Sequence, residues 1–194
     1  LYLRRLVRGA GPEVPGLPPS EPYPAARALA DWLVERGEAS LASHVARLSA
    51  HPAARAQVDL PGPVGERNTY ATRPRGLVEI RAQTRDGLIL ALGAALAAGN
   101  GVAVAEGPDL PDAVRDMLTT GHPDAVLVEG DAAHVIAVAE EVAARPGPVA
   151  PVQGIATARL LAGEDFAVEM LVREVSVSHN TAAAGGNATL MRLS

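Results

Sequence analysis

Between residues 77 and 152 the chain alternates short apolar runs with segments of helical periodicity. The apolar runs are rich in Val, Ile, Leu and Ala and occupy residues 77–80, 102–105, 125–128 and 149–152. The helical segments between them occupy residues 88–98, 110–118 and 132–144. This alternation is typical of βαβ units, whose right-handed crossovers build a parallel sheet covered by helices on both faces. The sequence therefore predicts an α/β, Rossmann-like domain.

The residues before this domain divide into three parts. Residues 1–7 (LYLRRLV) have neither a helix cap nor an initiator Met, and we interpret them as the end of a preceding module. Residues 9–24 contain six prolines and three glycines, a composition typical of a linker. Two apolar stripes at helical spacing follow, Leu29-Trp32-Leu33 and Leu41-Val45-Leu48. They predict a helical hairpin that packs on a neighbour, which completes a first region over residues 1–59.

The remaining segments of the chain show less regular sequence patterns. Residues 62–75 are rich in turn-forming and charged residues, and residues 155–162 have the pattern of a helix. Residues 166–178 alternate in a strand-like way, which predicts an extended β arm leading into a Gly/Ala tail. We expect a Rossmann-like domain over residues 60–165, and the arm with its C-terminal docking tail over residues 166–194.

Composition excludes several classes of function. All 17 basic residues are Arg and the net charge is −5, which argues against a nucleic-acid surface. The chain has no Cys, so disulfides, thiolate zinc sites and a cysteine nucleophile are excluded, and its five His residues show no metal-ligand spacing. No apolar run reaches the length of a membrane span. We expect a cytoplasmic protein, with peripheral membrane association of a longer parent left open.

The residues that follow the strands do not predict a nucleotide site or a catalytic group. The sequence contains neither GxGxxG nor GxxxxGK[ST]. Glu129 and Asp131 follow the third strand at the start of a helix, where two carboxylates oppose a phosphate, and Asp131 is also a suitable N-cap. Ser176 and Ser178 have only His179 nearby, on the opposite face of a strand, so no triad is predicted. We therefore predict no catalytic, cofactor-binding or metal-binding residue.

Two segments of unusual composition predict docking. Residues 179–191 read HNTAAAGGNATLM, whose small residues and flanking amides suit flat contact with a partner surface, because glycine allows close backbone approach. Residues 60–76 read LPGPVGERNTYATRPRG, in which Glu66-Arg67 and Arg73-Pro74-Arg75 favour ion pairs with another part of a parent protein over a free anion. The predicted docking residues are Asn180, Thr181, Ala182, Ala183, Ala184, Gly185, Gly186, Asn187, Glu66, Arg67 and Asn68.

Together these two segments resemble the C-terminal end of the proline utilization A family of bifunctional flavoproteins. ALAAGN at residues 95–100 is similar to the dinucleotide-binding half of aldehyde dehydrogenases, and the lysine that holds the cofactor ribose there falls on Ala105. The resemblance thus implies a degenerate aldehyde dehydrogenase half-domain without a cofactor of its own.

The resemblance also implies a setting for the chain. It implies a non-catalytic lid over the cavity through which pyrroline-5-carboxylate passes, docked on two modules of the same polypeptide. These are an FAD-dependent proline dehydrogenase and an NAD-dependent L-glutamate γ-semialdehyde dehydrogenase. The alternative is a Rossmann-like domain that binds a nucleotide or another small molecule for regulation.

Overall fold

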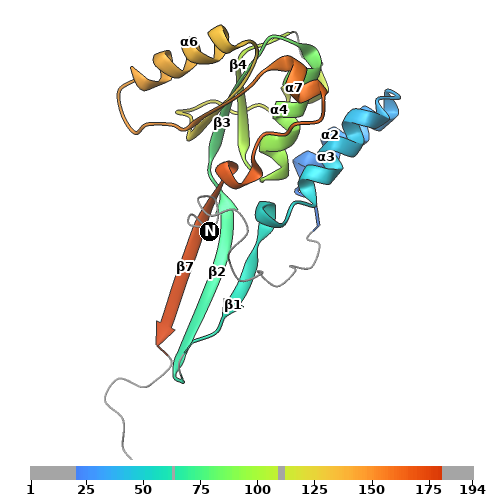
Figure 1. The fold of residues 1–194 in the computed structure, drawn as a ribbon. Coiled ribbons are helices and arrows are strands. Elements are labelled where there is room, and N and C mark those ends of the chain that lie inside the picture. The colour runs from blue at the N-terminus through green and yellow to red at the C-terminus, as the bar shows by residue number, and fades with distance from the viewer. Residues whose placement is uncertain (1–20, 63, 109–111, 181–194) are drawn as a thin grey trace, which may run out of the picture.

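The computed structural model describes residues 21–62, 64–108 and 112–180, which form two β-sheets with helices packed on the larger one (Figure 1). The larger sheet has four parallel strands in the order β4-β3-β5-β6. Its strands are β3 (Leu77–Ala82), β4 (Gly101–Glu106), β5 (Ala125–Glu129) and β6 (Val152–Ile155). Each is followed by a helix, in turn α4 (Arg85–Ala97), α5 (Asp112–Arg115), α6 (Ala132–Ala143) and α7 (Thr157–Leu161). The predicted parallel α/β fold is confirmed.

Strand β5 shows why the sheet has helices on both faces. Ala125 and Leu127 belong to the large core that contains α4, whereas Val126 and Val128 belong to a smaller core with α6. Successive side chains of a strand point to opposite faces, so a strand buried on both sides must be apolar throughout. This explains the unbroken run AVLV in the sequence.

Helix α4 is buried on all sides. Thr84 caps its N-terminus by accepting a hydrogen bond from the Gly87 N–H at 3.0 Å, and every residue from 87 to 97 is buried. The sheet covers one side of α4, and the helical hairpin of α2 (Pro24–Glu35) and α3 (Ala39–Ser49) covers another (Figure 1). The hairpin was predicted, and its neighbour is therefore α4 of the same domain.

Polar contacts also hold the hairpin in place. Arg85 at the start of α4 makes two hydrogen bonds of 2.8 Å to the Glu38 carboxylate between the two hairpin helices. Asp165 accepts hydrogen bonds from Arg47 and lies 2.9 Å from His44 Nε2. Burial alone would raise the pKa of Asp165, but the hydrogen bond from Arg47 and the charges of His44, Arg47 and His51 together lower it. Both carboxylates therefore tie the hairpin to the domain in their ionised form.

On the α6 face, strand β3 presents charged residues instead of apolar ones. Glu79 is buried and accepts hydrogen bonds of 2.8–2.9 Å from Arg81 and Arg145, while Glu141 accepts from the same two arginines. Two carboxylates and two guanidinium groups thus neutralise each other. This network extends the contact between α6 and the sheet beyond the valine core.

The smaller sheet has three antiparallel strands in the order β1-β2-β7, namely β1 (Gln57–Leu60), β2 (Glu66–Pro74) and β7 (Val172–Asn180). Figure 1 shows these strands running away from the rest of the molecule, and we call them the arm. A 3-10 helix, η1 (Pro52–Arg55), leads into β1, and another, η2 (Val168–Leu171), leads into β7. Strands β2 and β7 stay in antiparallel register along all nine residues of each strand, from Glu66 opposite Asn180 to Pro74 opposite Val172.

The arm corrects one sequence prediction. Residues 62–75 were predicted as turn-rich, but nine of them form β2. Thr69, Tyr70 and Thr72 favour extended structure, and Pro74 stands at the last position, where the missing N–H does not interrupt the ladder. The pairing partner lies about a hundred residues further on, so no local pattern could indicate it.

Other differences are shifts of boundaries. Strand β6 begins at Val152 rather than at residue 149, since Pro148 and Pro151 cannot donate to a ladder. Ile155 consequently lies in β6, and the helix predicted over residues 155–162 is α7. The arm strand begins at Val172, after η2, and not at residue 166. None of the helices in the described ranges combines the length and the apolar character needed to cross a bilayer.

Candidate functional site

The carboxyl ends of β3 and β5 form the edge where a Rossmann-like fold would hold a ligand. The chain passes from β3 to β4 on one side and then crosses over to β5 on the other, so the topological switch lies between β3 and β5. Ligands of open α/β sheets bind in the crevice at this switch, against the N-terminus of the helix that follows the first strand. In this chain that helix is α4.

A side chain of the protein fills this crevice. Glu129, the last residue of β5, is fully buried. Its carboxyl group accepts hydrogen bonds from the backbone N–H groups of Gln83 and Thr84 at 2.9 and 3.0 Å, and from the Thr84 hydroxyl at 3.2 Å. A β-carbon on Gly87 would collide with the Glu129 side chain. The N–H groups of Gln83, Thr84 and Gly87 at this turn are thus already bound within the protein, and the Glu129 carboxyl group occupies the position of a phosphate.

The sequence had placed Glu129 and Asp131 together at the turn, and the structure separates their roles. Asp131 accepts a hydrogen bond of 2.8 Å from the His134 N–H, which confirms it as the N-cap of α6. Glu129 turns inward to the start of α4 instead of facing a ligand at α6. Ala105, at the position of the ribose lysine, is exposed at the end of β4.

His134 is the one side chain at this edge with an unsatisfied atom. Its Nε2 is buried without a hydrogen-bond partner among the described residues, and Glu106 Oε2 lies 3.9 Å away. His134 and Glu106 can form an ion pair when the imidazole is protonated. Within the described ranges, no group of three or more His, Asp or Glu side chains is placed to hold a metal ion.

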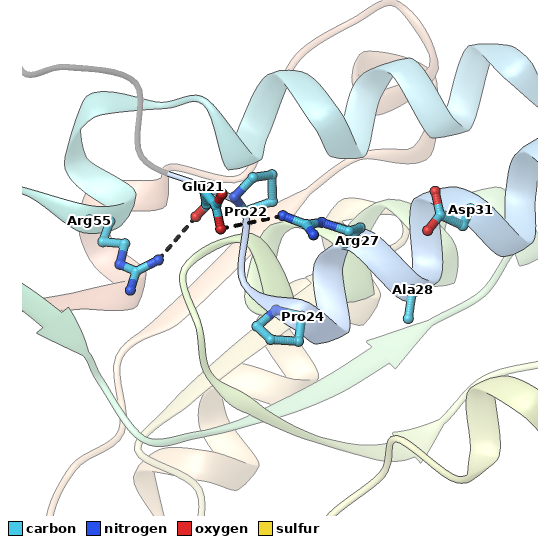
Figure 2. Close-up of a pocket in the computed structure, with 7 residues that line it drawn as sticks. All are labelled: Glu21, Pro22, Pro24, Arg27, Ala28, Asp31 and Arg55. Atoms are coloured by element: carbon cyan, nitrogen blue, oxygen red, sulfur yellow. Dashed lines mark hydrogen bonds and ion pairs between the residues drawn. The ribbon is translucent and has the colours of Figure 1, made fainter.

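A shallow hollow of about 420 Å³ lies beside the start of α2 (Figure 2). Its two arginines are both engaged by Glu21: Arg27 lies 3.8 Å from the carboxylate, and Arg55 donates to the backbone carbonyl at 3.1 Å (Figure 2). Arg55 also lies over the Tyr23 ring. Both arginines are thus already in contact with Glu21, so among the described residues that line the hollow no arginine is left unpartnered for an anionic ligand.

The arm brings together the predicted docking residues that the structure describes. At its far end, Glu66 pairs with Asn180, Arg67 with His179 and Asn68 with Ser178. The Ser178 hydroxyl lies within hydrogen-bond distance of both the Glu66 carboxylate and the Asn68 side-chain carbonyl and can donate its one hydrogen to either. Ser178 is thereby engaged in structural hydrogen bonds, and its neighbour His179 lies on the opposite face. The other predicted docking residues, Thr181, Ala182, Ala183, Ala184, Gly185, Gly186 and Asn187, lie outside the described residues.

Sequence reasoning missed two features of these sites. Thr84 was not singled out, although a Thr directly between a strand and an apolar helical run is a helix-start signal. Arg173 was seen only as part of an alternating pattern, and its position opposite Arg73 on β2 required the strand pairing.

Comparison with known proteins gives matches over the full chain. The bifunctional protein PutA of Rhizobium meliloti is 38% identical over 208 residues, which is 100% of this chain and 17% of the relative. PutA of Escherichia coli K12 is 37% identical over 185 residues, covering 86% of this chain and 13% of the relative. The chain therefore spans less than a fifth of these relatives. No protein-family model matches it.

Solved structures of proline utilization A proteins resemble this chain in fold. A mutant of Bradyrhizobium japonicum proline utilization A aligns with a TM-score of 0.52 at 20% identity, covering 67% of this chain and 19% of that one. A bifunctional proline utilization A protein aligns with a TM-score of 0.51 at 21% identity over the same shares. At these identities the likeness is one of fold.

Proposed function

The chain is homologous over its full length to part of the bifunctional PutA proteins of proline catabolism, and from this premise we propose that it is a non-catalytic docking and lid domain of such an enzyme. In this proposal it covers the cavity through which pyrroline-5-carboxylate passes. Its partners are the FAD-dependent proline dehydrogenase and NAD-dependent aldehyde dehydrogenase modules of one cytoplasmic polypeptide. The expected division into residues 1–59, 60–165 and 166–194 is modified in this proposal, because the hairpin packs on α4 and because β1 and β2 belong to the arm.

The observation that carries this proposal is the arm. Among the described residues, β2 is the one neighbour of β7 in the sheet, which makes β7 an edge strand, and residues 173–180 are exposed. An exposed edge offers a row of unpaired N–H and C=O groups, which pair readily with a strand of another module. The arm leads directly into the tail whose small residues suit flat docking.

The crevice at the edge of the parallel sheet is filled by Glu129, which supports a non-catalytic role. A dinucleotide would have to displace the buried Glu129 carboxyl group from three donors, and removing such a partner costs about 1–3 kcal/mol for each group left unsatisfied. The chain has no Cys to attack an aldehyde. These features favour docking over the alternative of a nucleotide-binding regulatory domain.

A substitution in the tail tests the proposal in the full-length enzyme that contains the chain. Gly186→Val places a branched side chain where close approach is proposed, at a local cost of about 1–3 kcal/mol. We expect proline oxidation at the flavin to persist, while the lag before NADH appears from proline lengthens. Ala158→Val, on the exposed side of α7, is the control and should leave the lag unchanged. An unchanged lag and unchanged semialdehyde kinetics in Gly186→Val would refute the docking role.

A further inference from the structure

We propose that one face of the arm, carrying Arg73, Arg173, Val175 and Val177, receives an acidic and apolar protein surface from another module of the same polypeptide. This inference rests on the proposed docking function and specifies which face of the arm docks and the chemistry of its partner. We call this face the arginine face. Three observations support the proposal: the strand register, the arginines that the register leaves without a counter-charge, and the exposed apolar residues beside them.

The register assigns each arm residue to a face. Residues directly opposite in an antiparallel pair lie on the same face, and alternate residues of a strand return to that face. Arg73 is opposite Arg173, Ala71 opposite Val175, and Thr69 opposite Val177. The arginine face is therefore formed by Arg67, Thr69, Ala71 and Arg73 of β2 with Arg173, Val175, Val177 and His179 of β7. The opposite face of β7 carries Glu174, Ser176, Ser178 and Asn180.

Two arginines on this face are held together without a counter-charge. Like charges directly opposite each other in a sheet repel. Neither Arg73 nor Arg173 has a carboxylate within ion-pair distance among the described residues. Arg73 donates to the Thr72 carbonyl at 3.2 Å and Arg173 to the Pro74 carbonyl at 3.3 Å. In a chain of net charge −5, such an uncompensated pair indicates a carboxylate supplied from outside the described residues.

Arg67, the third arginine of this face, differs from Arg73 and Arg173 because it has a carboxylate partner. It lies on the same face, nearer the far end of the arm, and Asp59 on β1 neutralises it at 3.1 Å. The chain thus provides a carboxylate where a third arginine stands on this face, but not at the base of the arm. Among the described residues of this face, the arginines without a carboxylate partner are therefore Arg73 and Arg173.

The residues next to these arginines are apolar and exposed. Val175 and Val177 have 37% and 43% of their surface exposed, although both stand in a strand paired along its length. On the opposite face of β7, the exposed residues Glu174, Ser176, Ser178 and Asn180 are polar, and the apolar Val172 at the start of the strand is buried. A partner that brings carboxylates to the arginines and apolar side chains to the valines matches this pattern, because protein interfaces combine an apolar centre with complementary charges.

Charge substitutions in the full-length enzyme test the inference. The measured quantity is the lag between the addition of proline and the appearance of NADH. We expect Arg173→Glu to lengthen the lag several-fold at low salt. In the wild type the lag should lengthen as salt rises from about 0.05 to 0.5 M, because salt screens exposed ion pairs. The double variant R73Q/R173Q should show a long lag at all salt concentrations. Arg159→Gln, on the exposed surface of α7 and outside the arm, also removes one arginine charge; it is the matched control and should resemble the wild type.

Two further measurements separate the possible outcomes. Thermal unfolding of R73Q/R173Q should be no lower than that of the wild type, since the substitution removes a repulsion, so a long lag would not reflect misfolding. A variant truncated after Asn180 tests the proposed docking function itself. If truncation lengthens the lag but Arg173→Glu behaves like the control Arg159→Gln, the arginine face is refuted and the docking function stands. If neither variant changes the lag, both are refuted.

Discussion

The carboxyl group of Glu129 accepts hydrogen bonds from both the backbone N–H and the hydroxyl of Thr84, at 3.0 and 3.2 Å. Glu129 ends β5 and Thr84 caps α4, so this contact joins the two central parallel strands at their carboxyl ends. A position that is open for a ligand in nucleotide-binding relatives of the fold is here part of the protein's own hydrogen-bond network. This edge of the parallel sheet therefore stabilises the fold and is not open to a ligand.

The first prediction concerns the stability that Glu129 provides. Glu129→Ala leaves the N–H groups of Gln83 and Thr84 without their acceptor and creates a cavity. We expect the free energy of unfolding to fall by about 2–4 kcal/mol, measured by urea denaturation. Glu140→Ala, on the exposed side of α6, is the control and should change it by less than about 0.5 kcal/mol. Equal effects of the two substitutions would show that the buried contact contributes little.

The second prediction concerns nucleotides. A ligand at a hundredfold excess over its dissociation constant stabilises a protein by about 2.7 kcal/mol, which raises Tm by about 5–10 °C in a chain of this size. Because Glu129 occupies the crevice, we expect no rise in Tm of the 194-residue chain with NAD, NADP or ATP at millimolar concentration. A rise of several degrees with any of them, absent with ribose alone, would favour the regulatory alternative.

The third prediction concerns the hairpin. A β-carbon on Gly93 of α4 would lie 2.7 Å from a methyl group of Val45 on α3, so the two helices pack as closely as a glycine allows. Gly93→Val should push the hairpin from α4 and lower the free energy of unfolding by about 1–3 kcal/mol. Hydrogen exchange should increase in α2 and α3 more than in β5. The control is Gly101→Ala, whose new methyl group meets its neighbours at an ordinary 3.6 Å.

Much of the parallel sheet could be predicted because its signals are local. The apolar run of β5 is buried on both faces, and Asp131 stands where a helix cap is expected. The arm could not be predicted in the same way. The pairing of Glu66 with Asn180 joins segments far apart in the chain, and prolines near β2 made its sequence resemble a loop.

The candidate sites were predictable to a similar extent. The sequence indicated a closed cofactor site from Glu129 and Asp131, but the direction of the Glu129 side chain follows from tertiary packing against Gly87. Glu66, Arg67, Asn68 and Asn180 were predicted to dock separately, and the structure places them at one end of the arm. The opposition of Arg73 and Arg173 is a property of register, which sequence alone does not specify.

The last prediction concerns acid sensitivity and the network around Glu79. Burial alone would raise the pKa of Glu79, but hydrogen bonds from Arg145 and Arg81 outweigh burial and lower the pKa below its ordinary value of 4.5. A carboxyl group whose pKa is lower in the folded state stabilises the protein above its unfolded pKa, and this contribution is lost as pH falls through the folded value.

Arg145→Gln removes two hydrogen bonds of 2.8 and 2.9 Å to Glu79 and raises the pKa of that carboxyl group toward its ordinary value. At pH 7 we expect the variant to be less stable than the wild type by about 1–3 kcal/mol. The difference should shrink as pH falls from 4.5 through the lower pKa of Glu79 in the folded wild type, because this carboxyl group then becomes protonated there as well.

Urea denaturation at pH 7, 5, 4 and 3 measures this difference. Arg159→Gln is the matched control, since Arg159 pairs with Glu164 on the exposed surface, where an ion pair contributes about 0–1 kcal/mol. A stability difference between Arg145→Gln and the wild type that stays constant from pH 7 to pH 3 would mean that Arg145 acts by packing on the sheet and not by holding Glu79 ionised. A difference that disappears in acid would identify the charge network as the contact through which α6 stabilises β3.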